Sequence, residues 1–227
     1  MSDPVANPEL LRSLGQLMRG LSVLFWGLPA ALVVCVQTSQ ADFLRLFGVL
    51  PPVLATGALV YSLLLLGRFR PEETVWIRAL ERARVLALVN LGLSPFLYWW
   101  SRLPSNVFYG AMVELMAVSG LTFLLLLNPL LRRLTAMLPD ETLRHETVLF
   151  TRLSTALLLL NLAALLLRIG VHHLGRPVRL NPPWSFLVDR ASHWGGWFFV
   201  LLTVAMTMAL IWKTKEAIFH SVFGGSH

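Results

Sequence analysis

Charged residues are scarce in this chain. Only 14% of its 227 residues are Asp, Glu, Lys or Arg, whereas 56% are hydrophobic. A soluble domain usually carries about 25% charged residues, because its surface must be covered with solvated groups. The composition therefore excludes a soluble globular protein and predicts an all-α integral membrane protein whose main partner is the lipid bilayer.

Cysteine and lysine are rare in this chain. Cys35 is the only cysteine, which excludes an internal disulfide bond and a thiolate metal cluster. The first 20 residues contain Asp3 and Glu9 and end without a small-residue cleavage site, so a removable signal peptide is not expected. Only two of the 19 basic residues are lysines, and this preference for arginine suggests a GC-rich bacterial genome.

The positive charge does not gather on one polar segment. The formal net charge is +7, yet the basic residues lie at the ends of apolar runs. Such positions suit membrane topology and contact with anionic lipid headgroups. A nucleic-acid partner is therefore not expected.

Six apolar runs predict about six transmembrane helices, arranged as three hairpins in a single transmembrane domain at residues 1–227. The expected spans are residues 21–36, 46–66, 85–100, 107–127, 148–169 and 197–212.

Prolines and aromatic residues mark the expected spans. Pro29 should kink the first span, Pro51 and Pro52 should lie in the first turns of the second, Pro95 should bend the third and Pro129 should stop the fourth. Three residues at the end of the third span predict an aromatic belt at the membrane interface: Tyr98, Trp99 and Trp100.

Three prolines precede short segments that we expect to form amphipathic helices on the membrane surface. Pro8, Pro71 and Pro139 are 63 and 68 residues apart, and acidic residues follow each of them. The first segment could equally be the extended start of the first span. The spacing fits a threefold internal repeat. It also fits three unrelated hairpins, each of which begins its inside helix with proline and acidic residues, and the sequence leaves both open.

The stretch from Gly67 to Arg84 is the most charged part of the chain and fixes the predicted orientation. With the N-terminus inside, the inside segments carry twelve Arg and Lys residues and the outside connections carry five. This bias predicts a multi-pass protein of the bacterial inner (plasma) membrane with both termini in the cytoplasm. The arginines assigned to topology or lipid headgroups are Arg68, Arg70, Arg78, Arg82, Arg84, Arg132 and Arg133.

The same stretch has a helical pattern of its own. Glu81 lies three residues from both Arg78 and Arg84 on the expected polar face. The apolar face is expected to hold Val75, Trp76, Ala79, Leu80 and Ala83. The segment should form a surface helix that runs into the third span, or it could dock a cytoplasmic partner.

Three polar residues within the spans are candidates for function. Glu114 is the one acidic residue well inside a span, where a charge costs about 2.5 kcal/mol or more. It could bind a proton or cation during transport, or form a structural hydrogen bond to Asn90, Asn161 or a hydroxyl group on a neighbouring helix. The two asparagines could hold helices together or line a pathway. A face of small residues predicts a central position for the fourth span: Gly110, Ala111, Ala117 and Gly120.

One group of residues in the last outer connection has metal-ligand chemistry. Imidazole nitrogens and a carboxylate could hold zinc or copper, although no HExxH spacing is present, and interfacial histidines are the simpler interpretation. The group comprises His172, His173, His193 and Asp189. No cofactor is expected. The segment at residues 181–197 should form a short helix that anchors to the outer membrane face.

No motif in the sequence identifies a reaction. Nucleophile elbows, phosphate loops, paired acidic motifs and haem-type histidine pairs are absent from it. The most favoured hypothesis is therefore a small transporter or an accessory subunit of a membrane complex, with a membrane-protein partner or a second copy of the chain. The alternatives are an enzyme acting on a lipid-linked substrate at the outer His/Asp group and a purely structural scaffold.

Overall fold

The computed structural model describes residues 8–40, 46–69, 73–136, 141–173, 200–216 and 218–219. Within these ranges, side chains are described except at residues 8–11, 40, 135–136, 141–147 and 172. The described residues form helices joined by short turns, and no strand occurs among them. The all-helical prediction is therefore confirmed for this part of the chain.

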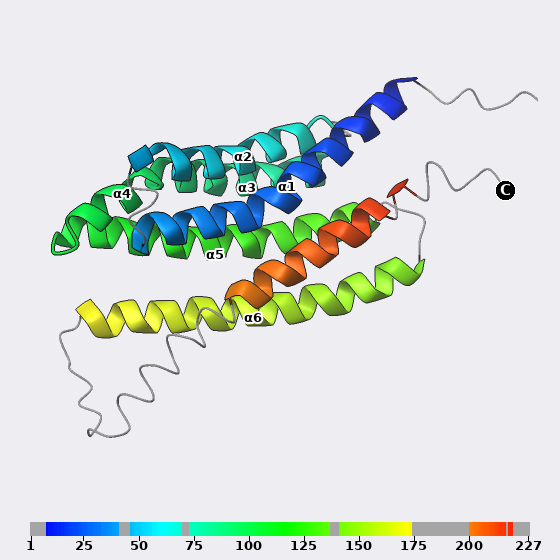
Figure 1. Cartoon of the computed structure of the whole chain (residues 1–227). Coiled ribbons are helices and arrows are strands. Elements are labelled where there is room, and N and C mark those ends of the chain that lie inside the picture. The colour runs from blue at the N-terminus through cyan, green and yellow to red at the C-terminus, as the bar shows by residue number, and fades with distance from the viewer. Residues whose placement is uncertain are drawn as a thin grey trace, which may run out of the picture.

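Long helices lying side by side make up the described fold (Figure 1). Consecutive long helices run in alternating directions, so the first turns of α1 and the end of the C-terminal helix lie at the same end of the bundle (Figure 1). The helices are α1 (Pro8–Gln40), α2 (Leu50–Leu66), α3 (Thr74–Leu93), α4 (Pro95–Arg102), α5 (Val107–Ala136), α6 (Glu141–His173) and a C-terminal helix at residues 200–216.

Three of these helices are long and apolar enough to cross a membrane. They contain the segments Arg12–Ser39 in α1, Val107–Leu134 in α5 and Val148–Val171 in α6. The apolar helix α2 is shorter, and α3 carries four charged residues between positions 78 and 84. The structure therefore supports a helical membrane protein, while the predicted number of six spans stays a prediction.

Several helices extend further than the sequence predicted. Because α1 is one helix from Pro8 to Gln40, its first part is the extended start of the first span. Pro29 lies inside it, and α1 changes direction along its length (Figure 1). The prediction that Pro129 ends the fourth span was wrong, because α5 continues to Ala136. Proline removes one helical hydrogen bond, and the burial of the leucines that follow offsets the free energy lost with it. Leu130, Leu131 and Leu134 are at most 1% exposed.

Pro95 separates two helices rather than bending one. The helix α3 ends at Leu93, and Pro95 occupies the first turn of α4. The N–H groups of a first turn have no partner within the helix, so the missing N–H of proline costs no hydrogen bond there. Ser94 keeps helical backbone angles between them, and its N–H donates to the carbonyl oxygen of Asn90 at 2.9 Å. Pro51 and Pro52 lie in the first turn of α2, as predicted.

The helices α1 and α2 approach each other closely through two glycines. An added Cβ on Gly20 would lie 3.2 Å from atoms of Leu65 and Leu66, and one on Gly27 would lie 3.1 Å from Leu59. Seven residues separate the two glycines, which is two helical turns, so both face the same neighbour. The absence of side chains at these positions lets the leucines of α2 pack against the backbone of α1.

The helix α5 lies at the centre of the described bundle. It packs against α3, α4 and α6, which confirms the central position predicted from its small residues. Gly120 faces Asn90 of α3, and Gly110 faces Trp100 of α4. Of the four predicted small residues, Ala117 is exposed and does not contribute to this packing.

The C-terminal helix packs across two other helices. Trp212 lies against Phe25 of α1, with ring centroids 5.8 Å apart, and the Lys213 ammonium lies 5.3 Å from the ring centroid of Phe150 in α6. This helix therefore connects the first and the last labelled helices of the bundle.

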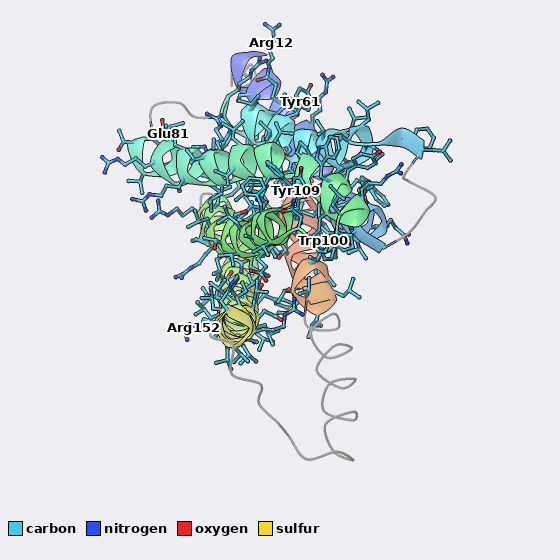
Figure 2. All side chains as sticks on the ribbon, turned by 90° about the vertical axis from the view of Figure 1, so that its left-hand side faces the viewer. Arg12, Tyr61, Glu81, Trp100, Tyr109 and Arg152 are labelled. Carbon is cyan, nitrogen blue, oxygen red and sulfur yellow. The ribbon has the colours of Figure 1, made fainter. Side chains whose placement is uncertain are left out.

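Aromatic residues gather where α4 meets the start of α5. Phe96 contacts Phe108 and Tyr109, with ring centroids 5.9 and 6.3 Å apart. Trp100 and Tyr109 lie at this end of the bundle, which faces the viewer in Figure 2. Of the predicted belt residues, Tyr98 and Trp99 contact each other with ring centroids 5.6 Å apart, and the Arg102 guanidinium lies 5.4 Å from the ring of Tyr98.

Candidate functional site

The first buried polar contact joins α3 to α5. Ser119 donates a 2.6 Å hydrogen bond to the side-chain oxygen of Asn90, and both side chains are buried. A buried amide without a partner would cost free energy, so this contact stabilises the close approach of the two helices. Asn90 therefore bonds to a hydroxyl group on the fourth predicted span, and the arrangement is that of a packing residue.

Asn161 bonds within its own helix. Its amide nitrogen donates to the carbonyl oxygen of Leu157, one turn earlier, at 2.9 Å. The side chain is half-buried, and Glu114 lies elsewhere on the bundle with another partner. The structure therefore does not bring the three predicted intramembrane residues together.

A second buried contact was not predicted. The amide nitrogen of Asn128 donates to the hydroxyl oxygen of Ser154 at 3.0 Å, which joins α5 to α6. The side-chain oxygens of Asn128 and Thr151 are buried without a hydrogen-bond partner among the described atoms. Asn128 directly precedes Pro129, where the sequence predicts the end of the fourth span. Extending the helical pattern through Pro129 would have placed Asn128 inside the bundle.

Glu114 contacts a residue that the sequence had placed in a different group. The carboxylate oxygen Oε2 of Glu114 in α5 lies 3.1 Å from Nε2 of His173 at the end of α6. The side chain of Glu114 is 27% exposed and that of His173 is 50% exposed. A carboxylate and an imidazole in contact can share a proton, and a protonated imidazole neutralises the acid that a membrane would otherwise penalise.

The predicted metal group is only partly visible in the structure. His193, Asp189 and the side chain of His172 lie outside the described residues. Among the residues that are described, no group of three or more His, Cys, Asp or Glu side chains could hold a metal ion. His173 is thus placed beside Glu114, and the metal interpretation stays a prediction.

Two of the topology arginines hold helices together. Arg84 of α3 donates from Nε and Nη2 to the carbonyl oxygen of Leu63 in α2, at 3.2 and 3.0 Å. Leu63 is in the last turn of α2, and its carbonyl oxygen also accepts a hydrogen bond from the backbone N–H of Gly67 at 3.2 Å, so the guanidinium group is an additional donor to it. Arg133 of α5 donates to the carbonyl oxygen of Val75 at 2.9 Å. Arg70 lies outside the described residues, and the other predicted arginines are exposed: Arg68, Arg78, Arg82 and Arg132.

Space at Gly67 is required by the Arg84 contact. A Cβ at position 67 would overlap Nη2 of Arg84 and lie 3.1 Å from Leu80. The backbone of Gly67 is helical, with φ −73°, so any residue could adopt this conformation. A side chain at position 67 would therefore displace the guanidinium group, which is the flexible end of the Arg84 side chain.

The predicted apolar face of α3 is largely correct. Trp76, Leu80 and Ala83 are fully buried, whereas Val75 is 49% exposed. The prediction for Val75 was wrong because the buried stripe is narrower than the expected face and is centred on Trp76. The indole N–H of Trp76 has no hydrogen-bond partner among the described atoms.

Comparison with known proteins adds no assignment. The chain matches no protein family, no curated protein and no solved structure.

Proposed function

We propose that this protein is a six-span component of the bacterial inner membrane that acts as an accessory subunit of a larger membrane complex. The observation that carries the proposal is a stripe on α6, which we call the α6 stripe. Five residues at alternating spacings of three and four are all exposed: Leu153, Ala156, Leu160, Ala163 and Leu167.

The α6 stripe has the pattern of a helix interface. Leu153, Leu160 and Leu167 are 55%, 57% and 71% exposed. Spacings of three and four keep one seam facing a partner helix, and small residues between large ones let two backbones approach within a membrane. Lipid chains would not require alanines between the leucines. The stripe therefore fits a helix of another membrane protein better than lipid alone.

The location and orientation rest on separate observations. The three helices that could cross a membrane, the alternating directions of the helices and the excess of arginine on one side support six crossings with both termini in the cytoplasm. Reporter fusions after residues 75, 140 and 184 test this. The first two should report the cytoplasm and the third the opposite side; a periplasmic signal at residue 75 would overturn the orientation.

Filling the gaps of the α6 stripe tests the accessory role. Ala156→Leu with Ala163→Leu keeps the surface apolar but removes the space for a partner backbone, so the protein should leave its complex on native gels of solubilised membranes. The matched control is Ala30→Leu with Ala117→Leu, because these alanines are also exposed but belong to α1 and α5. A complex that survives the first pair would overturn the assignment of the stripe. If the purified chain alone still migrated at the size of the complex, the partner on the stripe would be a second copy of this chain and not another protein.

A small carrier is a second candidate, favoured by the Glu114–His173 contact. A carboxylate and an imidazole that share a proton are suited to proton-coupled movement. Under this hypothesis, Glu114→Gln should abolish the protein's cellular function while the variant still inserts and accumulates. Normal growth of the variant strain, under conditions where deletion is harmful, would exclude Glu114 from function.

A further inference from the structure

A groove between α3 and α5 combines charged and apolar walls. It has a volume of about 470 Å³ and is lined by Arg78, Glu81, Arg82, Val85, Leu86 and Leu126. The groove is shallow and open along most of its surface, so it suits a ligand that lies along the outside of the helices. We call it the α3–α5 groove.

The polar and apolar walls of the groove follow each other along α3. Arg78 and Arg82 are one helical turn apart, and Leu86 follows one turn later on the same side. Leu126 comes from α5, inside the segment Val107–Leu134 that is long and apolar enough to cross a membrane. The groove therefore runs from a charged end to an apolar end at the boundary of the spanning region.

The charged residues of the groove are available to a ligand. Within the described residues, Arg78, Glu81 and Arg82 form no hydrogen bond or ion pair, and all three are exposed. This contrasts with Arg84 and Arg133, which bond to backbone carbonyl groups. In Figure 2, Glu81 lies at the edge of the molecule, away from the other helices.

We propose that the α3–α5 groove binds one phospholipid with an ethanolamine headgroup. Two guanidinium groups one turn apart match the geometry of a phosphate, which accepts bidentate hydrogen bonds from arginine. The carboxylate of Glu81 matches the ammonium group of ethanolamine. Val85, Leu86 and Leu126 contact the start of the acyl chains. A phospholipid with a purely anionic headgroup would satisfy the arginines but leave Glu81 next to a like charge or without a partner.

The proposal goes beyond the accessory role and depends only on the membrane location of this end of α3. Loss of lipid binding would leave the complex formed by α6 unaffected, and loss of that complex would leave the groove intact. The two proposals can therefore fail separately.

Native mass spectrometry of the full-length protein, purified in detergent and delipidated, tests the site. The probes are phosphatidylethanolamine and phosphatidylglycerol with matched acyl chains. We expect one molecule of phosphatidylethanolamine to bind more tightly than phosphatidylglycerol. Arg78→Gln with Arg82→Gln should weaken both lipids, on the order of tenfold or more for phosphatidylethanolamine. Glu81→Gln should remove the preference between them.

Arg12→Gln with Arg152→Gln provides the matched control. Both arginines are exposed, they lie on other sides of the bundle in Figure 2, and their replacement removes the same positive charge. This pair should retain the affinity of the wild type. Equal weakening by both double variants, tighter binding of phosphatidylglycerol by the wild type, or binding of an acidic peptide at this groove in place of lipid would overturn the proposal. Circular dichroism of each variant verifies that it is folded.

Discussion

Glu114 of α5 and His173 of α6 face each other, with the carboxylate oxygen 3.1 Å from the imidazole nitrogen. The contact joins the first half of α5 to the last residue of α6, so it holds the two antiparallel helices together at the end away from Ala136 and Glu141. Asn128 and Ser154 join the same helices further along. Polar contacts therefore join α5 and α6 at two positions along their length.

The Glu114–His173 contact should make a small contribution to the stability of the fold. A double-mutant cycle of Glu114→Gln and His173→Ala, measured by thermal unfolding in detergent, should give a coupling energy of up to about 1 kcal/mol, since both side chains are partly exposed. Salt should reduce the coupling, because dissolved ions screen interactions between exposed side chains. Additive effects of the two substitutions would contradict the contact.

The close approach of α1 and α2 should not tolerate a side chain at position 20. Gly20→Leu would force its side chain into the backbone and leucines of α2, and overpacking of this kind typically costs about 1–3 kcal/mol. Gly15 is the matched control because it lies in the same helix with no atom within 4 Å of an added Cβ. Gly15→Leu should be neutral or stabilising by up to about 1 kcal/mol, since leucine favours the helix. Equal unfolding temperatures for the two variants would show that the helices do not meet at Gly20.

Gly67 and Arg84 should behave as one unit. Gly67→Ala would displace the guanidinium group from the carbonyl oxygen of Leu63. That oxygen keeps its bond to the backbone N–H of residue 67, so the change should cost about 0.5–1.5 kcal/mol, the net value of one hydrogen bond. Arg84→Gln should cost a similar amount, and the double variant should cost little more than either single one. Gly92→Ala in α3 is the control, because an added Cβ there meets no atom within 4 Å. Full additivity of the first two changes would disprove the coupling.

The sequence predicted which segments are helical and apolar, because periodicity and composition are local properties. It also predicted the central place of α5, since small residues allow close approach wherever they face a neighbour. The partners of the polar residues could not be predicted, because they depend on the rotation of each helix about its axis. Asn90 and Asn161 look alike in the sequence, yet one bonds across helices and the other to its own backbone.

The interpretation of Pro129 shows the same limit. Proline usually ends a helix, and only the burial of the leucines after it reveals that packing outweighs the lost hydrogen bond. Arg84 is a further example. Its charge predicts one side of the membrane, and this stays a prediction. Its bond to Leu63 depends on the spacing of α2 and α3, which the local sequence does not determine.

Asn90 and Asn161 provide a matched pair for measuring what an interhelical hydrogen bond contributes here. Asn90→Leu removes the acceptor of the Ser119 hydroxyl in a buried position and should destabilise the protein by about 0.6–2 kcal/mol. Asn161→Leu removes only a bond to the carbonyl of Leu157, which also belongs to the helical backbone ladder, so this variant should be close to neutral. Thermal unfolding of both variants in the same detergent makes the comparison, and Ser119→Ala added to Asn90→Leu should cost little more. If Asn161→Leu were the more damaging change, the packing role would belong to α6 rather than to the α3–α5 contact.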